Sequence, residues 1–148
     1  KGTVYRQAMF AEFEMQTNKM AEAGESLTAD ALNSLYHELN RKYYGPDMIS
    51  DDEIAFEWAR IPHFYYNFYV YQYATGFSAA VSIAKAILEE GAPAVERYRK
   101  FLSGGCSQAP VELLKIAGVN MEEPGPIQDA LDVFDSVMDE LEGLLDEF

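Results

Sequence analysis

Glycine and proline separate stretches in which apolar residues recur at helical spacing, and this pattern constrains the fold more than any other feature. No stretch sustains the alternation of apolar and polar residues that a strand requires. We therefore predict an all-α fold of about seven helices, forming a single helical domain over residues 1–148. The expected helices run from Thr3 to about Ala23, Thr28 to Gly45, Ser50 to Arg60, His63 to about Glu90, Pro93 to about Leu102, Pro110 to Gly118, and from Pro126 onward.

The fourth of these helices has two further features. Its second half, from Ala79 to Leu88, is small and aliphatic, which predicts a buried helix. Gly76 lies inside it and costs about 1 kcal/mol relative to alanine, so we expect another backbone or a ligand to approach there. Thr28 and Ser50 are the expected N-caps of the second and third helices, and Glu53 completes a capping box with Ser50.

Composition limits the classes of partner. The net charge is −14 with 49% hydrophobic residues, which is typical of a folded soluble chain and disfavours nucleic-acid or anionic-membrane partners. The single cysteine, Cys106, excludes an intrachain disulfide. There is neither an uninterrupted apolar run of membrane-spanning length nor a signal-peptide pattern. We expect a cytoplasmic protein.

The last helix is amphipathic. One face is acidic, and no lysine or arginine follows Lys115. We interpret it as a docked terminal helix with a solvated acidic face, and a coiled-coil seam is the alternative. The apolar stripe comprises Ile127, Leu131, Phe134, Met138, Leu141, Leu145 and Phe148.

Residues 60–76 are dense in polar-tipped aromatics and hold one of the two histidines. On a helix, His63, Tyr66, Tyr69 or Val70, and Tyr73 would share one stripe. Imidazole and phenol groups can donate hydrogen bonds to the oxyanion that develops when an amide is hydrolysed. The alternative is an aromatic core helix whose tyrosine hydroxyls bond to neighbours. Residue spacing alone leaves both interpretations open.

Other catalytic patterns are missing or weak. The sequence contains no His-Glu-x-x-His, Cys-x-x-Cys, glycine-rich phosphate loop or Gly-x-Ser-x-Gly. Two histidines and one cysteine cannot build a zinc site of ordinary spacing, so we predict no metal ligands in this chain. His37 is expected on the surface of the second helix. Cys106 lies in a flexible loop with no base nearby in sequence, which disfavours a catalytic thiol.

Three segments carry a resemblance to a known family. Arg60-Ile61-Pro62-His63-Phe64-Tyr65-Tyr66-Asn67-Phe68-Tyr69-Val70-Tyr71-Gln72-Tyr73-Ala74-Thr75-Gly76 resembles the C-terminal segment of the oligoendopeptidase F family, within the thimet-oligopeptidase-like zinc metallopeptidases. Residues 4–14 and 39–45 resemble neighbouring segments of the same enzymes. The resemblance implies that this chain is the C-terminal helical part of such a catalytic domain, with a zinc-binding His-Glu-x-x-His and a later glutamate upstream of it.

The resemblance also implies roles for individual residues. His63 matches the histidine that bonds substrate or the tetrahedral intermediate. The family's tyrosine donors fall within residues 66–73, although the glycine-rich loop of better-studied relatives is missing. The implied catalytic residues are His63, Tyr66, Tyr69 and Tyr73. Tyr71 is the substitute donor, and the implied substrate-binding residues are Tyr71, Arg60 and Gly76.

Two interpretations follow. In the first, the chain is part of a zinc metalloendopeptidase acting on short peptides. Its partner is then the upstream segment, and alone it should bind no zinc, hydrolyse nothing and tend to self-associate through exposed surface. In the second, it is a stand-alone helical protein-interaction module without a catalytic role. A hydrolase using Cys106 is a weaker third option.

Overall fold

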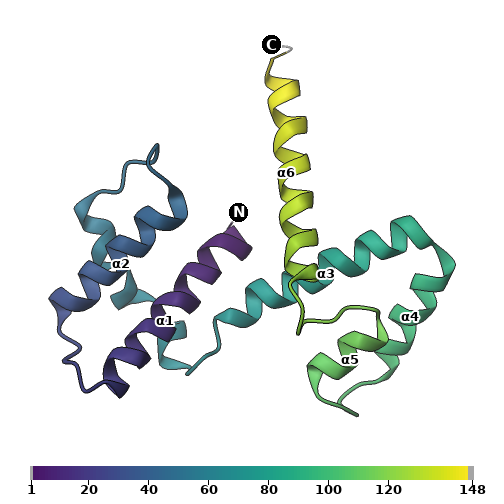
Figure 1. Cartoon of the computed structure of the whole chain (residues 1–148), viewed down its shortest axis with the longest axis horizontal. Helices are drawn as coiled ribbons and strands as arrows, with labels where there is room; N and C mark the ends of the chain where they lie inside the picture. The colour runs from purple at the N-terminus through teal and green to yellow at the C-terminus, as the bar shows by residue number, and fades with distance from the viewer. Residues whose placement is uncertain (1, 147–148) are drawn as a thin grey trace. The chain divides into compact units, whose positions relative to one another are not determined.

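The computed structural model describes residues 2–146 and divides into two compact units, Lys1–Ala74 and Thr75–Phe148. All regular structure in the described residues is helical, which confirms the all-α prediction (Figure 1). Each unit has its own cluster of buried hydrophobic residues.

The first unit holds two α-helices and three short helical segments. A π-helical turn, η1 (Gly2–Arg6), precedes α1 (Gln7–Glu22), and α2 (Ala29–Tyr44) follows. Two 3-10 helices come next, η2 (Asp52–Arg60) and η3 (Pro62–Tyr65).

The predicted caps of these helices are confirmed only in part. Thr28 caps α2, because its hydroxyl oxygen accepts a hydrogen bond from the Ala31 amide at 3.3 Å. The first α-helix begins at Gln7 rather than at Thr3. The predicted Ser50 cap is wrong. Asp51 caps the third segment instead, with its carboxylate accepting from the Ile54 amide at 2.9 Å, and that segment is a 3-10 helix.

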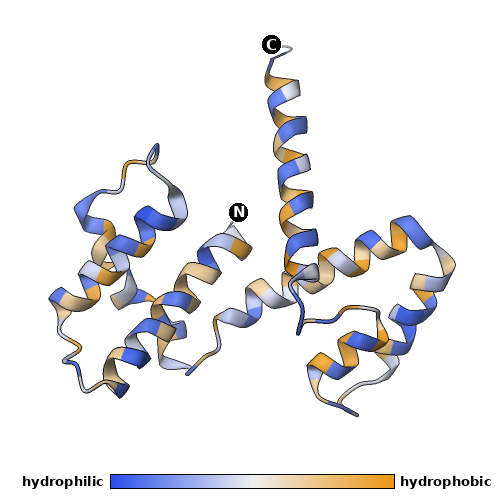
Figure 2. Cartoon of the chain, viewed as in Figure 1, coloured by the Kyte–Doolittle hydropathy of each residue, from blue (hydrophilic) through white to orange (hydrophobic). Residues whose placement is uncertain are grey.

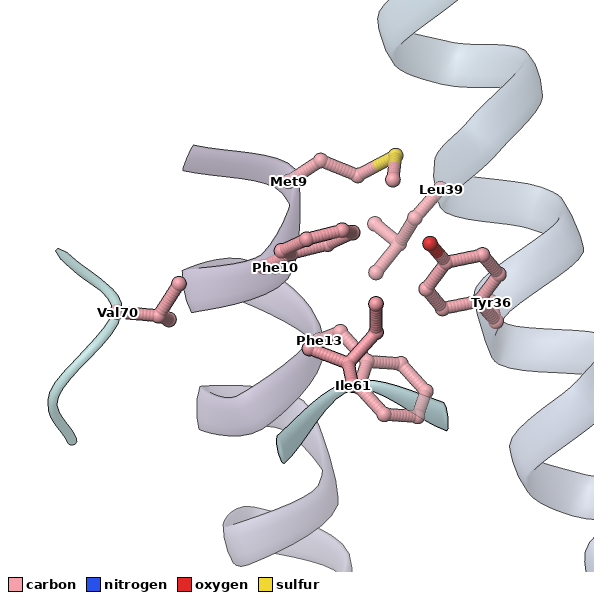
Figure 3. Close-up of a cluster of buried hydrophobic side chains, with 7 residues drawn as sticks. All are labelled: Met9, Phe10, Phe13, Tyr36, Leu39, Ile61 and Val70. Carbon is pink, nitrogen blue, oxygen red and sulfur yellow. The ribbon is translucent and has the colours of Figure 1, made fainter. Parts of the chain in front are cut away.

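The core of the first unit forms where α1 faces α2. Phe13 contacts Tyr36 edge-on with ring centroids 5.3 Å apart, and Phe10 contacts Phe64 in the same geometry at 5.6 Å. Segments distant in sequence contribute Ile61 and Val70 to this core. The seven buried members are Met9, Phe10, Phe13, Tyr36, Leu39, Ile61 and Val70 (Figure 3).

A buried carboxylate ties this core to its surroundings. Glu57 accepts hydrogen bonds from the Arg6 guanidinium and the Tyr36 hydroxyl, each at 2.6 Å, and also pairs with Arg60. Burial alone would raise the pKa of Glu57, but the hydrogen bonds from Arg6 and Tyr36 outweigh it and hold the pKa below its usual range. One charged group therefore joins η1, α2 and η2.

The second unit holds most of α3 (Tyr71–Glu90), with α4 (Ala92–Ser103), α5 (Pro110–Ile116) and α6 (Gly125–Leu145). Ala79 and Ile83 of α3 pack with Ala117 and Val119. The start of α6 is fixed to α3 through Asp129, which accepts from Lys85 at 2.6 Å and from Ser82 at 2.9 Å.

Two helices are less buried than the sequence predicts. The second half of α3 was expected to be a buried helix, but Ala80, Ala84 and Leu88 are exposed. The predicted docking of α6 is wrong beyond its first turns, because Leu141 and Leu145 of its apolar stripe are exposed. Hydrophobic and hydrophilic residues alternate along this helix (Figure 2). Phe148 lies outside the described residues.

We expect the chain to self-associate through these exposed apolar side chains, and this stays a prediction.

Within residues 2–146, no helix combines the length and hydropathy that crossing a membrane requires.

Replacing Tyr36 with Phe tests the role of the buried carboxylate. Because Glu57 then loses a buried donor, the free energy of unfolding should fall by about 1.5–3 kcal/mol, measured by urea denaturation at neutral pH. Tyr43→Phe is the matched control on the same helix. Its hydroxyl donates to Glu12, which also holds Lys42 and is less buried. Equal losses for the two variants would contradict the assignment.

The stability difference between wild type and Tyr36→Phe should also depend on pH. The folded-state pKa of Glu57 lies below its unfolded value of about 4.3, so the stabilisation from its ionised form is fully present above that value. It is lost as the pH falls through the folded-state pKa. The difference between wild type and Tyr36→Phe should therefore shrink in acid.

Candidate functional site

The segment expected to form one helix from His63 to Glu90 is instead two helices joined by a turn, so that prediction is wrong. The 3-10 helix η3 ends at Tyr65, and α3 begins at Tyr71. Between them, Asn67 and Phe68 adopt left-handed backbone conformations with φ of 44° and 57°.

Core packing explains the turn. Phe64 and Val70 both pack into the core of the first unit. On a continuous α-helix, residues six positions apart lie about 120° from each other around the axis, so one helix would not bury both side chains. The chain turns between them, and the turn carries His63 and Tyr73 toward each other.

The turn assembles an aromatic cluster, which we define as His63, Tyr66, Tyr69 and Tyr73. His63 Nε2 lies 3.2 Å from the Tyr73 hydroxyl oxygen. The His63 ring stacks on that of Tyr69 with centroids 6.1 Å apart, and Tyr69 contacts Tyr66 and Tyr73 edge-on at 6.3 Å and 5.7 Å. These residues were expected to meet along one helical stripe. They meet instead across a turn.

The cluster is not a hydrophobic core. Tyr66, Tyr69 and Tyr73 are 63%, 44% and 38% exposed, and His63 is half-buried. Ile61, Phe64 and Val70 supply the buried contacts of this segment. The hydrogen-bonding groups of the cluster are therefore open to a ligand.

The hydroxyl group of Tyr73 has a raised pKa. Desolvation, followed by a hydrogen bond with Tyr69, raises the pKa of the Tyr73 hydroxyl. Since the neutral phenol carries the proton, Tyr73 remains a hydrogen-bond donor to higher pH than an ordinary tyrosine.

The remaining predicted site residues lie outside this cluster. The Arg60 guanidinium pairs with Glu57. Tyr71 is the half-exposed first residue of α3. Gly76 belongs to the second unit. A Cβ built there would meet nothing within 4 Å, so the expected close approach of another backbone is wrong.

The other histidine, His37, is half-buried on α2. Its Nε2 lies 3.4 Å from the Ser50 carbonyl oxygen.

The described residues do not fit a zinc site. Across residues 2–146, no three side chains of histidine, cysteine, aspartate or glutamate converge as metal ligands. The neighbours of His63 are phenols, which are not the usual ligands of zinc.

One residue beside the cluster was not predicted from the sequence. Glu14 is buried on α1, and its carboxylate accepts a hydrogen bond from the Phe68 amide. A signal for it exists, because Glu14 lies four residues after Phe10 and therefore on the same face of α1. An acidic side chain in that position faces the core.

Comparison with known proteins identifies the family. The model of peptidase family M3 matches residues 1–133. The chain belongs to peptidase family M3. This membership confirms the resemblance drawn from residues 60–76.

Individual relatives agree. This M3 chain is 54% identical to oligopeptidase PepF of Bacillus subtilis (strain 168), covering 98% of the chain and 22% of that protein. It is 48% identical to the chromosomal oligoendopeptidase F of Lactococcus lactis subsp. cremoris, covering 99% and 24%. The crystal structure of oligoendopeptidase-F from Enterococcus faecium superposes with a TM-score of 0.97 at 51% identity, covering 100% and 28%.

The M3 chain thus spans about a quarter of the length of these relatives. It corresponds to a C-terminal piece of a larger, oligoendopeptidase F-like peptidase.

Replacing Tyr69 with Phe tests the electrostatics of the cluster. Removing the Tyr69 hydroxyl that accepts the hydrogen bond of the neutral Tyr73 phenol should lower the pKa of Tyr73 toward the ordinary tyrosine value of about 10, measured by NMR titration of 13C-labelled tyrosines. Tyr65→Phe, which alters a more exposed neighbour, should leave the pKa of Tyr73 unchanged. The same pKa in wild type and Tyr69→Phe would contradict the contact.

Proposed function

We propose that the intact protein is a zinc metalloendopeptidase that hydrolyses short peptides. In this proposal, the M3 chain supplies hydrogen-bond donors to the substrate carbonyl and to the oxyanion that develops from it. The observation that carries the proposal is the 3.2 Å contact between His63 Nε2 and the Tyr73 hydroxyl, inside an exposed aromatic cluster. Family membership supports the reaction class.

The geometry suits a shared acceptor. Two donor atoms 3.2 Å apart can both reach one oxygen at an ordinary hydrogen-bond distance of about 2.9 Å. Without substrate, His63 and Tyr73 bond to each other, and a substrate oxygen would replace that bond with two. Tyr73, whose pKa is raised, brings its proton to the oxygen without carrying a charge of its own.

The other members of the cluster extend this role. Tyr69 contacts both His63 and Tyr73 and holds them in place, and Tyr66, at the outer edge, is a donor to more distant substrate atoms. Tyr71 and Gly76 are proposed substrate contacts. Arg60 can contact substrate only if it gives up part of its pairing with Glu57.

Zinc and the base that activates water belong, in this proposal, to the part of the protein that precedes the M3 chain. Zinc would supply the Lewis acid and the activated water. The chain by itself is then inactive. We place the intact enzyme in the cytoplasm, with short peptides and the upstream segment as its partners.

The alternative of a stand-alone interaction module is less well supported. Family membership favours a peptidase, and the relatives are about four times as long as this chain. The exposed apolar faces of α3 and α6 then have a simple explanation as contacts with the rest of the longer protein.

Substitutions at the pair test the proposal in the longer protein. His63→Ala and Tyr73→Phe should each lower kcat by about 100-fold, because each removes a donor used mainly in the transition state. Hydrolysis of an internally quenched peptide measures the rate, and metal analysis should show unchanged zinc.

Tyr65→Phe is the matched control for this measurement. It removes a hydroxyl from the same segment, on a more exposed side chain outside the cluster, and kcat should stay at the wild-type value. Full activity of His63→Ala and Tyr73→Phe, with zinc bound, would contradict the proposal.

A further inference from the structure

A buried carboxylate on α1 contacts the turn that forms the aromatic cluster. Glu14 is 4% exposed, and its Oε1 accepts a hydrogen bond from the Phe68 backbone amide at 2.7 Å. The two residues are 54 positions apart in sequence, so the bond joins the turn to a helix that is distant from it in the chain. A bond of this length between an amide and an ionised carboxylate is charge-assisted and strong.

The turn needs such an anchor. Asn67 and Phe68 have φ of 44° and 57°, and a left-handed conformation costs a residue with a Cβ roughly 1–2 kcal/mol. Asparagine tolerates this region, but phenylalanine rarely occupies it. Phe68 is itself exposed, so its side chain does not supply the compensating energy.

Two contacts fix the turn, one at its middle and one at its C-terminal end. Glu14 holds the amide of Phe68, and Val70, two residues later, is fully buried in the core. Tyr69 lies between these two fixed points, and Tyr73 follows in the first turn of α3. The direction in which α3 leaves the turn determines whether the Tyr73 hydroxyl reaches His63.

We propose that Glu14 is a positioning residue for the peptidase reaction, holding the turn at residues 66–70 so that Tyr69 and Tyr73 meet His63. This inference rests on the proposed function. Glu14 does not contact substrate in it. Glu14 acts on the transition state through the placement of the cluster, because donors displaced by about 1 Å lose much of their effect.

The test uses the longer protein that contains this chain, with three variants. Glu14→Ala removes the acceptor, and Glu14→Gln keeps a neutral acceptor of the same length. Glu12→Gln is the matched control. Glu12 lies on the same helix, but it accepts hydrogen bonds from Lys42 and Tyr43 of α2. Circular dichroism and zinc content check that each variant folds.

The first readout is independent of activity. Hydrogen–deuterium exchange by mass spectrometry, resolved at residues 66–70, should be faster by at least about tenfold at Phe68 in Glu14→Ala. It should be intermediate in Glu14→Gln and unchanged in Glu12→Gln.

The second readout is kinetic. Glu14→Ala should lower kcat between about 10-fold and 100-fold, with KM changed much less, and Glu14→Gln should recover part of the loss. A merely structural role would instead lower the stability of Glu14→Ala and Glu14→Gln without a specific loss of kcat. If Glu14→Ala does not fold, Glu14→Gln decides the test by itself.

Two results would overturn the inference. One is unchanged exchange at Phe68 in the Glu14 variants. The other is a kcat loss no larger than that of Glu12→Gln, although His63→Ala and Tyr73→Phe are impaired. If His63→Ala and Tyr73→Phe retain full activity, the proposed function fails instead, and the exchange measurement alone decides whether Glu14 anchors the turn.

Discussion

The candidate site depends on the burial of Val70 in the same core as Ile61 and Phe64. Burying a side chain of this size stabilises a fold by about 1.5–3 kcal/mol, and a continuous helix would give up that contact for one of them. The chain therefore turns at Asn67 and Phe68, and the strain of two left-handed residues is offset by core contacts and by the Glu14 carboxylate. The proximity of His63 to Tyr73 is a consequence of packing.

Two buried carboxylates, Glu57 and Glu14, have different structural roles in the first unit. Glu57 joins Arg6, Tyr36 and Arg60 and so ties three helical segments into one scaffold. Glu14 accepts from a backbone amide and fixes a single turn. Both are hydrogen-bonded, as buried charges must be. One stabilises the framework, and the other is inferred to set the geometry of the cluster that the framework supports.

The sequence predicted the helical class and several helix ends because those depend on local chemistry. The cap at Thr28 and the stop at Gly45 follow from neighbouring residues alone. The turn at residues 66–70 was not predicted, because it contains no glycine and the contacts that hold it are long-range. They are the packing of Val70 in the core and the hydrogen bond from Phe68 to Glu14, 54 residues away. The pattern of α6 shows that one face is apolar, but it cannot show which segment covers that face. The four cluster residues lie near one another, but they meet across a turn and not along the helical stripe that suggested them. Their roles in catalysis stay predictions.

A double-mutant cycle on His63 and Tyr73 in the longer protein tests the central claim most directly. The kcat/KM of peptide hydrolysis would be measured for wild type, His63→Ala, Tyr73→Phe and the double variant. If the two groups act as a pair on one oxygen, the double variant should lose little more than the more impaired single variant. Losses that multiply, as for independent sites, would contradict a paired role for these two residues.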